Sequence, residues 1–363
     1  MKIFFTSLKQ PSLDLPDSKV WHNNLYLPLL DMGHEVIKFD CDLEAFFLLD
    51  QEAQQKRRVK FEEQLLERVK KEHAIKPIDL FFSYFYDTMC GPELIREIRS
   101  LGIMTVNWYC NASYQLEMVE KISPAYDWCW VPEKFRMDDY RRLGANPLYV
   151  QEAANPNIYK PYPVLQKYDV GFVGQCYGNR RWYLDQLYAK GKLDVHGWGP
   201  KWKRNPPSGL KALPSKTKGY IRELTGNRSP FLPWFRCHSP LSDEEMVKMY
   251  SRCKISLGFS VCDSAGDNEP PILQVRLRDF EAPMSGAFYM TEYFDELSEF
   301  FEPGKEIVMY HDIDDLIDKC RYYLTHENER ERIRQAGLKR ARGEHSWQRR
   351  FSDAFEKMGL AGQ

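Results

Sequence analysis

Residues 169–180 read DVGFVGQCYGNR, and this stretch decides the fold. An apolar run ends in a loop that holds Gly174 and Gly178, and a helical pattern follows over 180–189. A buried strand that leads through a glycine loop into a helix is typical of a β-α-β unit. The stretch therefore predicts a parallel sheet covered by helices in this part of the chain.

The same alternation of apolar runs and helical patterns continues toward both ends of the chain. Upstream, strands are predicted at 2–6, 35–39, 78–83, 103–108, 128–131 and 148–150. Downstream, strands are predicted at 193–197, 254–259, 287–291 and 306–310, and helices at 243–253, 275–284, 314–325 and 327–342. The pattern indicates two doubly wound α/β domains whose facing edges form a central cleft for a ligand.

A proline-rich stretch separates the two runs of alternation. We expect a Rossmann-like domain over 1–155, a linker over 156–168, a second Rossmann-like domain over 169–345, and a C-terminal helix over 346–363 that packs back on the first domain. Residues 200–240 interrupt the second domain with nine Lys and Arg residues against one acid. We interpret this segment as a long basic loop or small subdomain inserted in the second domain, and loops of this length are usually either functional or disordered.

Composition excludes several classes of protein. Of 363 residues, 43% are hydrophobic and 28% charged, as in ordinary globular proteins. The 51 basic and 52 acidic residues nearly cancel, which argues against a nucleic-acid partner for the whole protein. The chain lacks an apolar run long enough to span a membrane, a signal peptide and paired cysteine spacing, so we expect a cytoplasmic location. The histidine spacing predicts no metal site.

Two short motifs contain candidate binding residues. At the glycine loop, backbone N–H groups near Gly174, together with Arg180 or Arg181, suit a diphosphate at a helix start. Further on, Arg278 and Glu281 lie three residues apart on a predicted helix, where a carboxylate can accept two hydrogen bonds from a ribose diol. The glycine loop alone is equally compatible with a tight turn that has an exposed arginine pair. The spacing of Arg278 and Glu281 alone favours a surface Arg–Glu pair.

The second motif lies in a region that resembles a known family. The matching segments are RDFEAPMSGA at 278–287, FEPGKEIVMY at 301–310, YYLTHENER at 322–330, Ala336-Gly337 and HSWQRR at 345–350. Together they resemble the C-terminal half of the CgeB-like, spore-maturation-type glycosyltransferases, which are related to the retaining family-four enzymes. The resemblance covers 240–351 well, with weaker matches at 172–174 and 102–108. It implies a GT-B fold with a nucleotide-sugar donor on the second domain and the acceptor on the first.

The resemblance also implies roles for residues on the donor side. Glu281 matches the glutamate that holds the nucleotide ribose, and Gly174, Arg180 and Arg181 match the loop that faces the diphosphate. Related enzymes often carry another glutamate eight positions before the first, where this chain has Leu273. The pattern is therefore broken at the position next to the donor sugar.

Three further residues are candidates for the catalytic machinery beside Arg180. Glu269 lies close enough in sequence to substitute for the missing glutamate. Asn111 stands at the end of a strand where related enzymes place sugar-facing residues, often an acid. His22, expected in the loop after the first strand, is a candidate to face the acceptor, although a histidine there can equally be a core or solvent residue.

The resemblance implies a glycosyltransferase of the hexosyltransferase type. We expect transfer from a UDP- or GDP-sugar to a glycan, glycolipid or glycoprotein, with retention. Cations and helix N-termini would stabilise the leaving diphosphate, so no metal or other cofactor is expected. The basic insertion at 200–240 is expected to contact an anionic acceptor or the inner face of an anionic membrane. The alternative is a non-catalytic GT-B-like module that binds a nucleotide-sugar or glycan in surface assembly.

Overall fold

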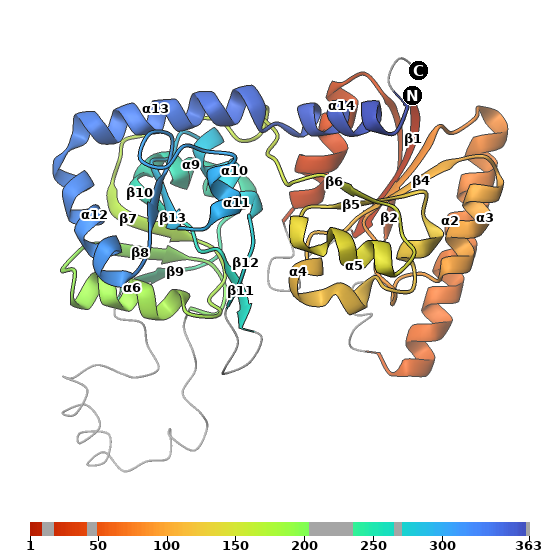
Figure 1. Ribbon diagram of the computed structural model, residues 1–363, viewed down its shortest axis with the longest axis horizontal. Coiled ribbons are helices and arrows are strands. Elements are labelled where there is room, and N and C mark those ends of the chain that lie inside the picture. Colours follow the sequence, from red (N-terminus) through yellow and green to blue (C-terminus); the bar gives the residue numbers. More distant parts are fainter. Residues whose placement is uncertain (9–17, 42–48, 203–234, 265–270, 361–363) are drawn as a thin grey trace, which may run out of the picture. The chain divides into compact units, whose positions relative to one another are not determined.

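The computed structural model describes residues 1–8, 18–41, 49–202, 235–264 and 271–360. The chain divides into two compact units. Unit 1 comprises Met1–Ile158, Ala265–Leu277 and Glu344–Gln363, and unit 2 comprises Tyr159–Ser264 and Arg278–Gly343 (Figure 1). Residues 203–234 of the expected basic insertion and Glu269 lie outside the described residues.

Unit 1 is built on a parallel sheet with the strand order β2-β1-β3-β4-β5-β6. The strands are β1 (Lys2–Leu8), β2 (Glu35–Cys41), β3 (Leu80–Ser83), β4 (Met104–Trp108), β5 (Trp128–Val131) and β6 (Pro147–Tyr149). β1 lies between β2 and β3, and its Ile3, Phe4 and Phe5 are fully buried. An uninterrupted apolar run is what a strand covered on both faces requires.

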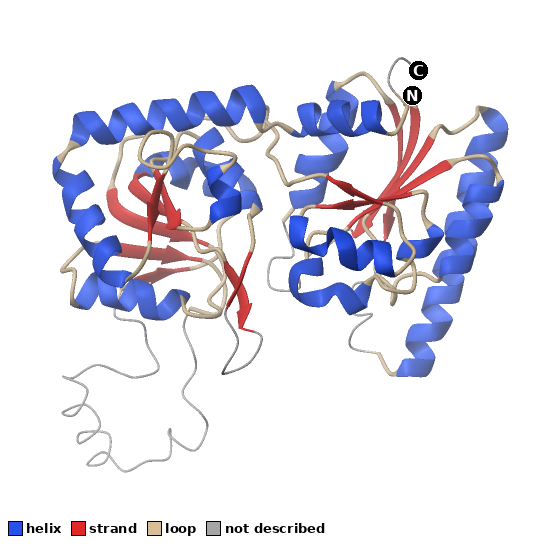
Figure 2. Ribbon diagram, in the orientation of Figure 1, coloured by secondary structure: helices blue, strands red, loops and turns tan. Residues whose placement is uncertain are grey.

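Helices flank the sheet of unit 1 (Figure 2). They are the π-helix η1 (His22–Tyr26), α1 (Leu27–Asp31), α2 (Gln51–Ile75), α3 (Pro92–Ser100), α4 (Ala112–Gln115), α5 (Met137–Arg142) and α14 (Trp347–Lys357), with short 3-10 turns at Leu116–Met118, Ser123–Ala125 and Lys134–Arg136. The short strand β12 (Pro271–Leu273) also belongs to this unit. Trp347 of α14 is fully buried, and its ring meets that of Trp108 edge-on at 5.0 Å.

Unit 2 is built on a second parallel sheet, with the strand order β14-β13-β10-β7-β8-β9. The strands are β7 (Tyr168–Val173), β8 (Val195–Trp198), β9 (Arg236–His238), β10 (Cys253–Leu257), β13 (Tyr289–Glu292) and β14 (Val308–Tyr310), and β11 (Val261–Ser264) lies outside this sheet. The order reverses between β7 and β10, as in a Rossmann fold. The predicted α/β architecture with two parallel sheets is thus confirmed, although β9, β11 and β12 have no counterpart in the sequence analysis.

The helices of unit 2 are α6 (Arg180–Ala189), α9 (Asp243–Arg252), α10 (Leu277–Met284), α11 (Asp295–Ser298), α12 (Ile313–Thr325) and α13 (Glu327–Glu344). Leu184 and Leu187 of α6 share one core with Leu316 of α12 and with Val170 and Phe172 of β7. The period of apolar residues in α6 therefore turns one face of the helix onto the sheet.

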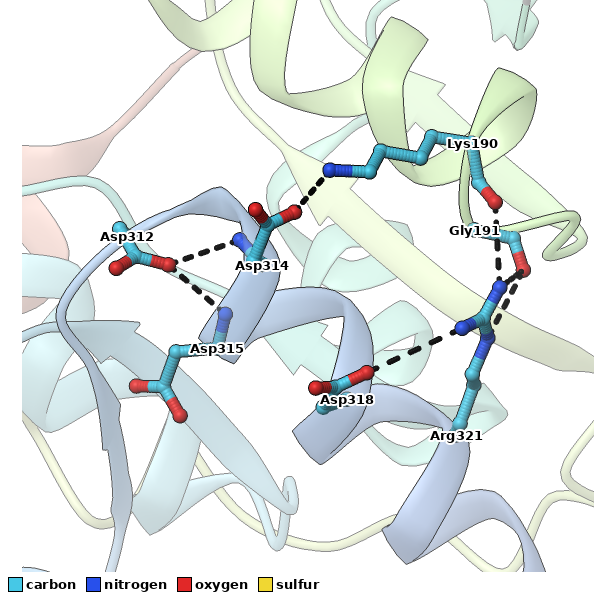
Figure 3. Close-up of polar contacts among 7 residues, drawn as sticks. All are labelled: Lys190, Gly191, Asp312, Asp314, Asp315, Asp318 and Arg321. Carbon is cyan, nitrogen blue, oxygen red and sulfur yellow. Dashed lines mark hydrogen bonds and ion pairs between the residues drawn. The ribbon is translucent and has the colours of Figure 1, made fainter.

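Polar contacts join the end of α6 to α12 (Figure 3). The side chain of Arg321 donates to the carbonyl oxygens of Lys190 and Gly191, at 3.2 and 3.1 Å. Lys190 also pairs with Asp314. At the start of α12, Asp312 accepts hydrogen bonds from two backbone N–H groups, each at 2.9 Å. The contacts of Arg321 and Asp314 therefore attach the carboxyl end of α6 to α12.

Candidate functional site

The topology of unit 2 marks one place on the sheet as the expected ligand site. In open α/β sheets, ligands bind beyond the carboxyl ends of the strands where the strand order reverses. Here that place lies between β7 and β10. The loop Gly174–Gly178 follows β7, and Gly258 follows β10. The rings of Phe172 and Phe259, whose centroids are 5.0 Å apart, bring the two strand ends together.

The turn at Gly174 is held against the end of β8. Its N–H donates to the carbonyl oxygen of Trp198 at 2.8 Å, and its own carbonyl oxygen accepts from Nε1 of Trp202 at 2.9 Å. A Cβ on Gly199 would lie 2.1 Å from the carbonyl oxygen of Gly174. A Cβ on Gly174 would lie 2.6 Å from a guanidinium nitrogen of Arg278. Because Gly174 has no Cβ, its backbone can lie close to the guanidinium of Arg278.

Two arginines share the ring of Phe172 beside this turn. The guanidinium carbon of Arg180 lies 5.3 Å from the centre of that ring, and the guanidinium carbon of Arg278 lies 4.8 Å from it. Arg180 is 3% exposed and also lies over the ring of Tyr177 at 3.6 Å. It donates to the Tyr177 hydroxyl and, at 3.1 Å, to the carbonyl oxygen of Gln175. Aromatic faces attract cations without neutralising them.

Arg278 remains a cation despite its position between the sheet and α9. Burial works against its charged form, but nearby phenol groups and the carboxylate of Glu281 outweigh burial and raise the pKa of Arg278 above its ordinary value. One of those phenols belongs to Tyr250 of α9, which is buried. Two positive charges therefore converge on one backbone turn, which suits a ligand with more than one negative charge.

Glu281 lies near this centre, and Arg181 has another partner. Glu281 follows Arg278 by one turn of α10, is 6% exposed and interacts electrostatically with it. Nε of Arg181 donates instead to the carboxylate of Asp185, one turn along α6, at 3.4 Å. The structure therefore gathers Gly174, Arg180, Arg278 and Glu281, whereas Arg181 is engaged in an ion pair within its own helix.

The two remaining candidates that the structure describes belong to unit 1. His22 lies in the π-helix η1 rather than in the loop that the sequence predicts, and its ring stacks on Tyr26 with the centroids 5.0 Å apart. Burial, and then the charge of Lys38, lower the pKa of His22. Asn111 lies between the end of β4 and the start of α4, close to the strand end where the sequence places it. Its Oδ1 is 3.9 Å from Sγ of Cys110.

The aromatic residues of this site could not be recognised from the sequence. Phe172 and Tyr177 both lie in the quoted stretch 169–180, but nothing local distinguishes a ring that holds an arginine from an ordinary core residue. Among the described residues, none of the groups of His, Cys, Asp and Glu side chains is arranged to hold a metal ion. None of the described helices is both long and apolar enough to cross a membrane.

The sequence and the structure are similar to known glycosyltransferases. Residues 180–356 match the model of a family described as glycosyl transferase-like. No curated protein matches the sequence. The structure is similar to sucrose-phosphate synthase from Thermosynechococcus elongatus, at 13% identity and a TM-score of 0.63, with 100% of each chain covered. It is also similar to an alpha-glucosyltransferase solved with UDP-glucose and abasic DNA, at 11% identity and a TM-score of 0.64, with 99% of each chain covered.

A third similar structure is that of HepE from Anabaena, solved with UDP and glucose. Its sequence identity is 10% and its TM-score 0.56, with 99% of each chain covered. At these identities the likeness establishes the fold, and it confirms the predicted GT-B architecture. The family match, over just under half of the chain, confirms the predicted enzyme class. Residues 180–356 thus match a glycosyl transferase-like family, within a chain that has the GT-B fold.

Proposed function

We propose that this protein transfers a sugar from a nucleotide-sugar to a glycan, lipid or protein acceptor, as the resemblance to CgeB-like enzymes implies. The observation that carries the proposal is the convergence of Arg180 and Arg278 on the ring of Phe172, beside the Gly174 turn. A nucleoside diphosphate has the charge that this pair of cations suits. HepE was solved with UDP and glucose, and the alpha-glucosyltransferase with UDP-glucose, which supports a UDP-sugar before a GDP-sugar.

The proposed mechanism rests on where charge develops. When the sugar–phosphate bond breaks, the nucleoside diphosphate gains negative charge, and preorganised cations stabilise that charge. Arg180 is the first residue of α6, so the helix N-terminus adds its own partial positive charge at the same point. Glu281 would accept hydrogen bonds from the ribose diol. This arrangement supports leaving-group stabilisation without a metal, and retention of configuration follows from the family resemblance.

Roles on the acceptor side are proposals as well. Asn111 would contact the acceptor or the donor sugar, His22 the acceptor, and Glu269 the donor sugar in place of the glutamate that Leu273 replaces. Arg181 would contribute to the diphosphate site only by leaving Asp185. We place the protein in the cytoplasm, with residues 200–240 contacting an anionic acceptor or the inner membrane face.

The direct test is turnover of the donor. The purified protein is incubated with UDP-glucose or GDP-mannose, with and without a mixture of glycan and glycolipid acceptors, and free nucleoside diphosphate is measured. Release that depends on an acceptor supports a transferase. Binding of UDP or GDP without release under any condition would favour the alternative, a binding module in surface assembly. Leu273, in the position of a glutamate near the donor sugar, is the observation that favours this second candidate.

A further inference from the structure

Glu292, the last residue of β13, holds the loop that follows β10. Its Oε2 accepts a hydrogen bond from the backbone N–H of Ser260 at 2.6 Å and a second from the N–H of Val261 at 3.1 Å. Glu292 is 8% exposed and Ser260 is fully buried. Hydrogen bonds to a carboxylate are about twice as strong as neutral ones, so this is a firm attachment of backbone to side chain.

Other contacts from β13 and β14 fix the start of the same loop. The N–H of Gly258 donates to the carbonyl oxygen of Met290 at 2.8 Å, and the hydroxyl of Tyr310 donates to the carbonyl oxygen of Gly258 at 3.3 Å. A Cβ on Gly258 would lie 1.9 Å from the hydroxyl oxygen of Tyr289. The loop Gly258–Val261 thus has its path set by the neighbouring strands rather than by its own sequence.

The loop Gly258–Val261 borders the donor site. Phe259 contacts Phe172, the ring shared by Arg180 and Arg278. Phe259 also lies 5.7 Å from the ring of Tyr183, one turn after Arg180 in α6. The pKa of Tyr183 is raised, first by burial and then by the charge of Glu292, so the carboxylate lies close to α6.

We propose that Glu292 is a positioning residue for the donor nucleotide-sugar, acting by holding Ser260 and Val261 so that Phe259 packs against Phe172, the ring that the two arginines share. This inference rests on the proposed function, because it assigns Glu292 to the same donor site. Glu292 is not expected to touch the reacting atoms. Desolvating a buried carboxylate costs free energy. The hydrogen bonds from the N–H groups of Ser260 and Val261 offset this cost and fix the loop.

The inference is tested with calorimetric binding of UDP and of GDP to the full chain and three variants of Glu292. Glu292→Ala removes both hydrogen bonds, and we expect Kd to rise at least about tenfold, the equivalent of one or two lost hydrogen bonds to a charged group. Glu292→Gln keeps an acceptor oxygen at the same distance and should bind within about threefold of the wild type. Glu292→Asp, which is less prone to misfolding, is too short to reach both N–H groups and should weaken binding.

The control is Asp169→Ala, which removes an ion pair with Lys254 at the amino ends of β7 and β10, with 2.8 Å between Oδ1 and Nζ. Thermal unfolding is measured on every variant. If Glu292→Ala lowers only the unfolding temperature and binds nucleotide as the wild type does, Glu292 is merely structural and the inference is wrong. Rescue by Glu292→Gln of binding lost in Glu292→Ala supports it. A wild-type chain that binds neither UDP nor GDP would overturn the proposed donor site itself, and this inference with it.

Discussion

Among single residues, Glu281 is the one proposed to bind the ribose of the nucleotide. Glu281 is buried in α10 near Arg278, and its carboxylate is the proposed partner of the ribose hydroxyls. We predict that Glu281→Ala weakens UDP binding by about 1.5–3 kcal/mol, the value of hydrogen bonds to a charged group. Calorimetry measures this directly. Glu302→Ala, which removes an exposed carboxylate paired with Lys305, is the control and should leave Kd unchanged.

His22 provides a pH-dependent prediction. Burial, and then the charges of Lys38 and Lys19, lower the pKa of His22 from its ordinary value of 6.5. In acid the unfolded chain therefore binds a proton at His22 before the folded chain does. The contribution of His22 to the free energy of unfolding is retained above the ordinary pKa. It is lost as the pH falls from the ordinary pKa through the lower pKa of the folded state.

The measurement is thermal unfolding between about pH 7 and pH 5. His22→Gln should flatten the decline of the unfolding temperature with acid, because the variant has no proton to take up at this position. A wild-type slope in His22→Gln would contradict the assigned environment of His22.

The residue scale also shows how far sequence reasoning reaches. Gly174, Arg180 and Glu281 stand in local motifs, so they could be named without a structure. Phe172 and Glu292 could not, because their significance comes from strands and helices far away in the sequence. The sequence likewise marks Arg181 and Arg180 as equals. The structure separates them, because Arg180 lies over the ring of Phe172 whereas Arg181 pairs with Asp185.

At the scale of elements, the close approach of the β7 turn to the end of β8 is the feature most sensitive to change. A Cβ on Gly199 would lie 2.1 Å from the carbonyl oxygen of Gly174, and backbone on both sides leaves no flexible atom to move. We predict that Gly199→Ala displaces the turn and weakens UDP binding at least about tenfold, because the turn lies against the guanidinium of Arg278 and would displace that cation. Calorimetry and thermal unfolding are the measurements.

Gly304→Ala is the matched control for Gly199→Ala. Gly304 also has a positive φ, 77°, but a Cβ there would meet nothing within 4 Å. It carries the backbone strain of the substitution, of the order of 1 kcal/mol, without the collision. Equal nucleotide affinity in the Gly199 and Gly304 variants would mean that the Gly174 turn takes no part in binding.

Elements with strong local patterns are the ones that sequence analysis predicts well. The helix α6 and the strand β5 have the bounds that the sequence predicts, because apolar residues recur there at a clear period between turn-forming residues. β9 is missed because Arg236 and His238 are polar, the strand lies at the sheet edge, and it follows a segment rich in prolines and basic residues. Edge strands need only one partner and no apolar alternation.

At the scale of the whole molecule, the C-terminal segment belongs to unit 1. Trp347, Phe351 and Phe355 of α14 are buried in the same core as Trp108 and Trp130. We predict that Trp347→Ala destabilises the protein by about 3–5 kcal/mol, as is typical when a large buried ring is removed. Chemical denaturation measures the loss.

Trp182→Ala is the control, because this indole is 50% exposed on α6 and its removal should cost far less. UDP binding should survive Trp347→Ala under conditions where unit 2 stays folded, since Gly174, Arg180, Arg278 and Glu281 all belong to unit 2. Loss of less than 1 kcal/mol from Trp347→Ala, roughly the value expected at a surface position, would contradict the placement of α14 in the core.

Two guanidinium groups beside the Gly174 turn are proposed to recognise a diphosphate. Calorimetric binding of UDP and of uridine is compared between the wild type, Arg180→Gln and Arg278→Gln. Each substitution is expected to weaken UDP binding by about 1.5–3 kcal/mol and to leave the much weaker binding of uridine nearly unchanged. Equal losses for UDP and uridine, or no loss for either ligand, would contradict this proposal.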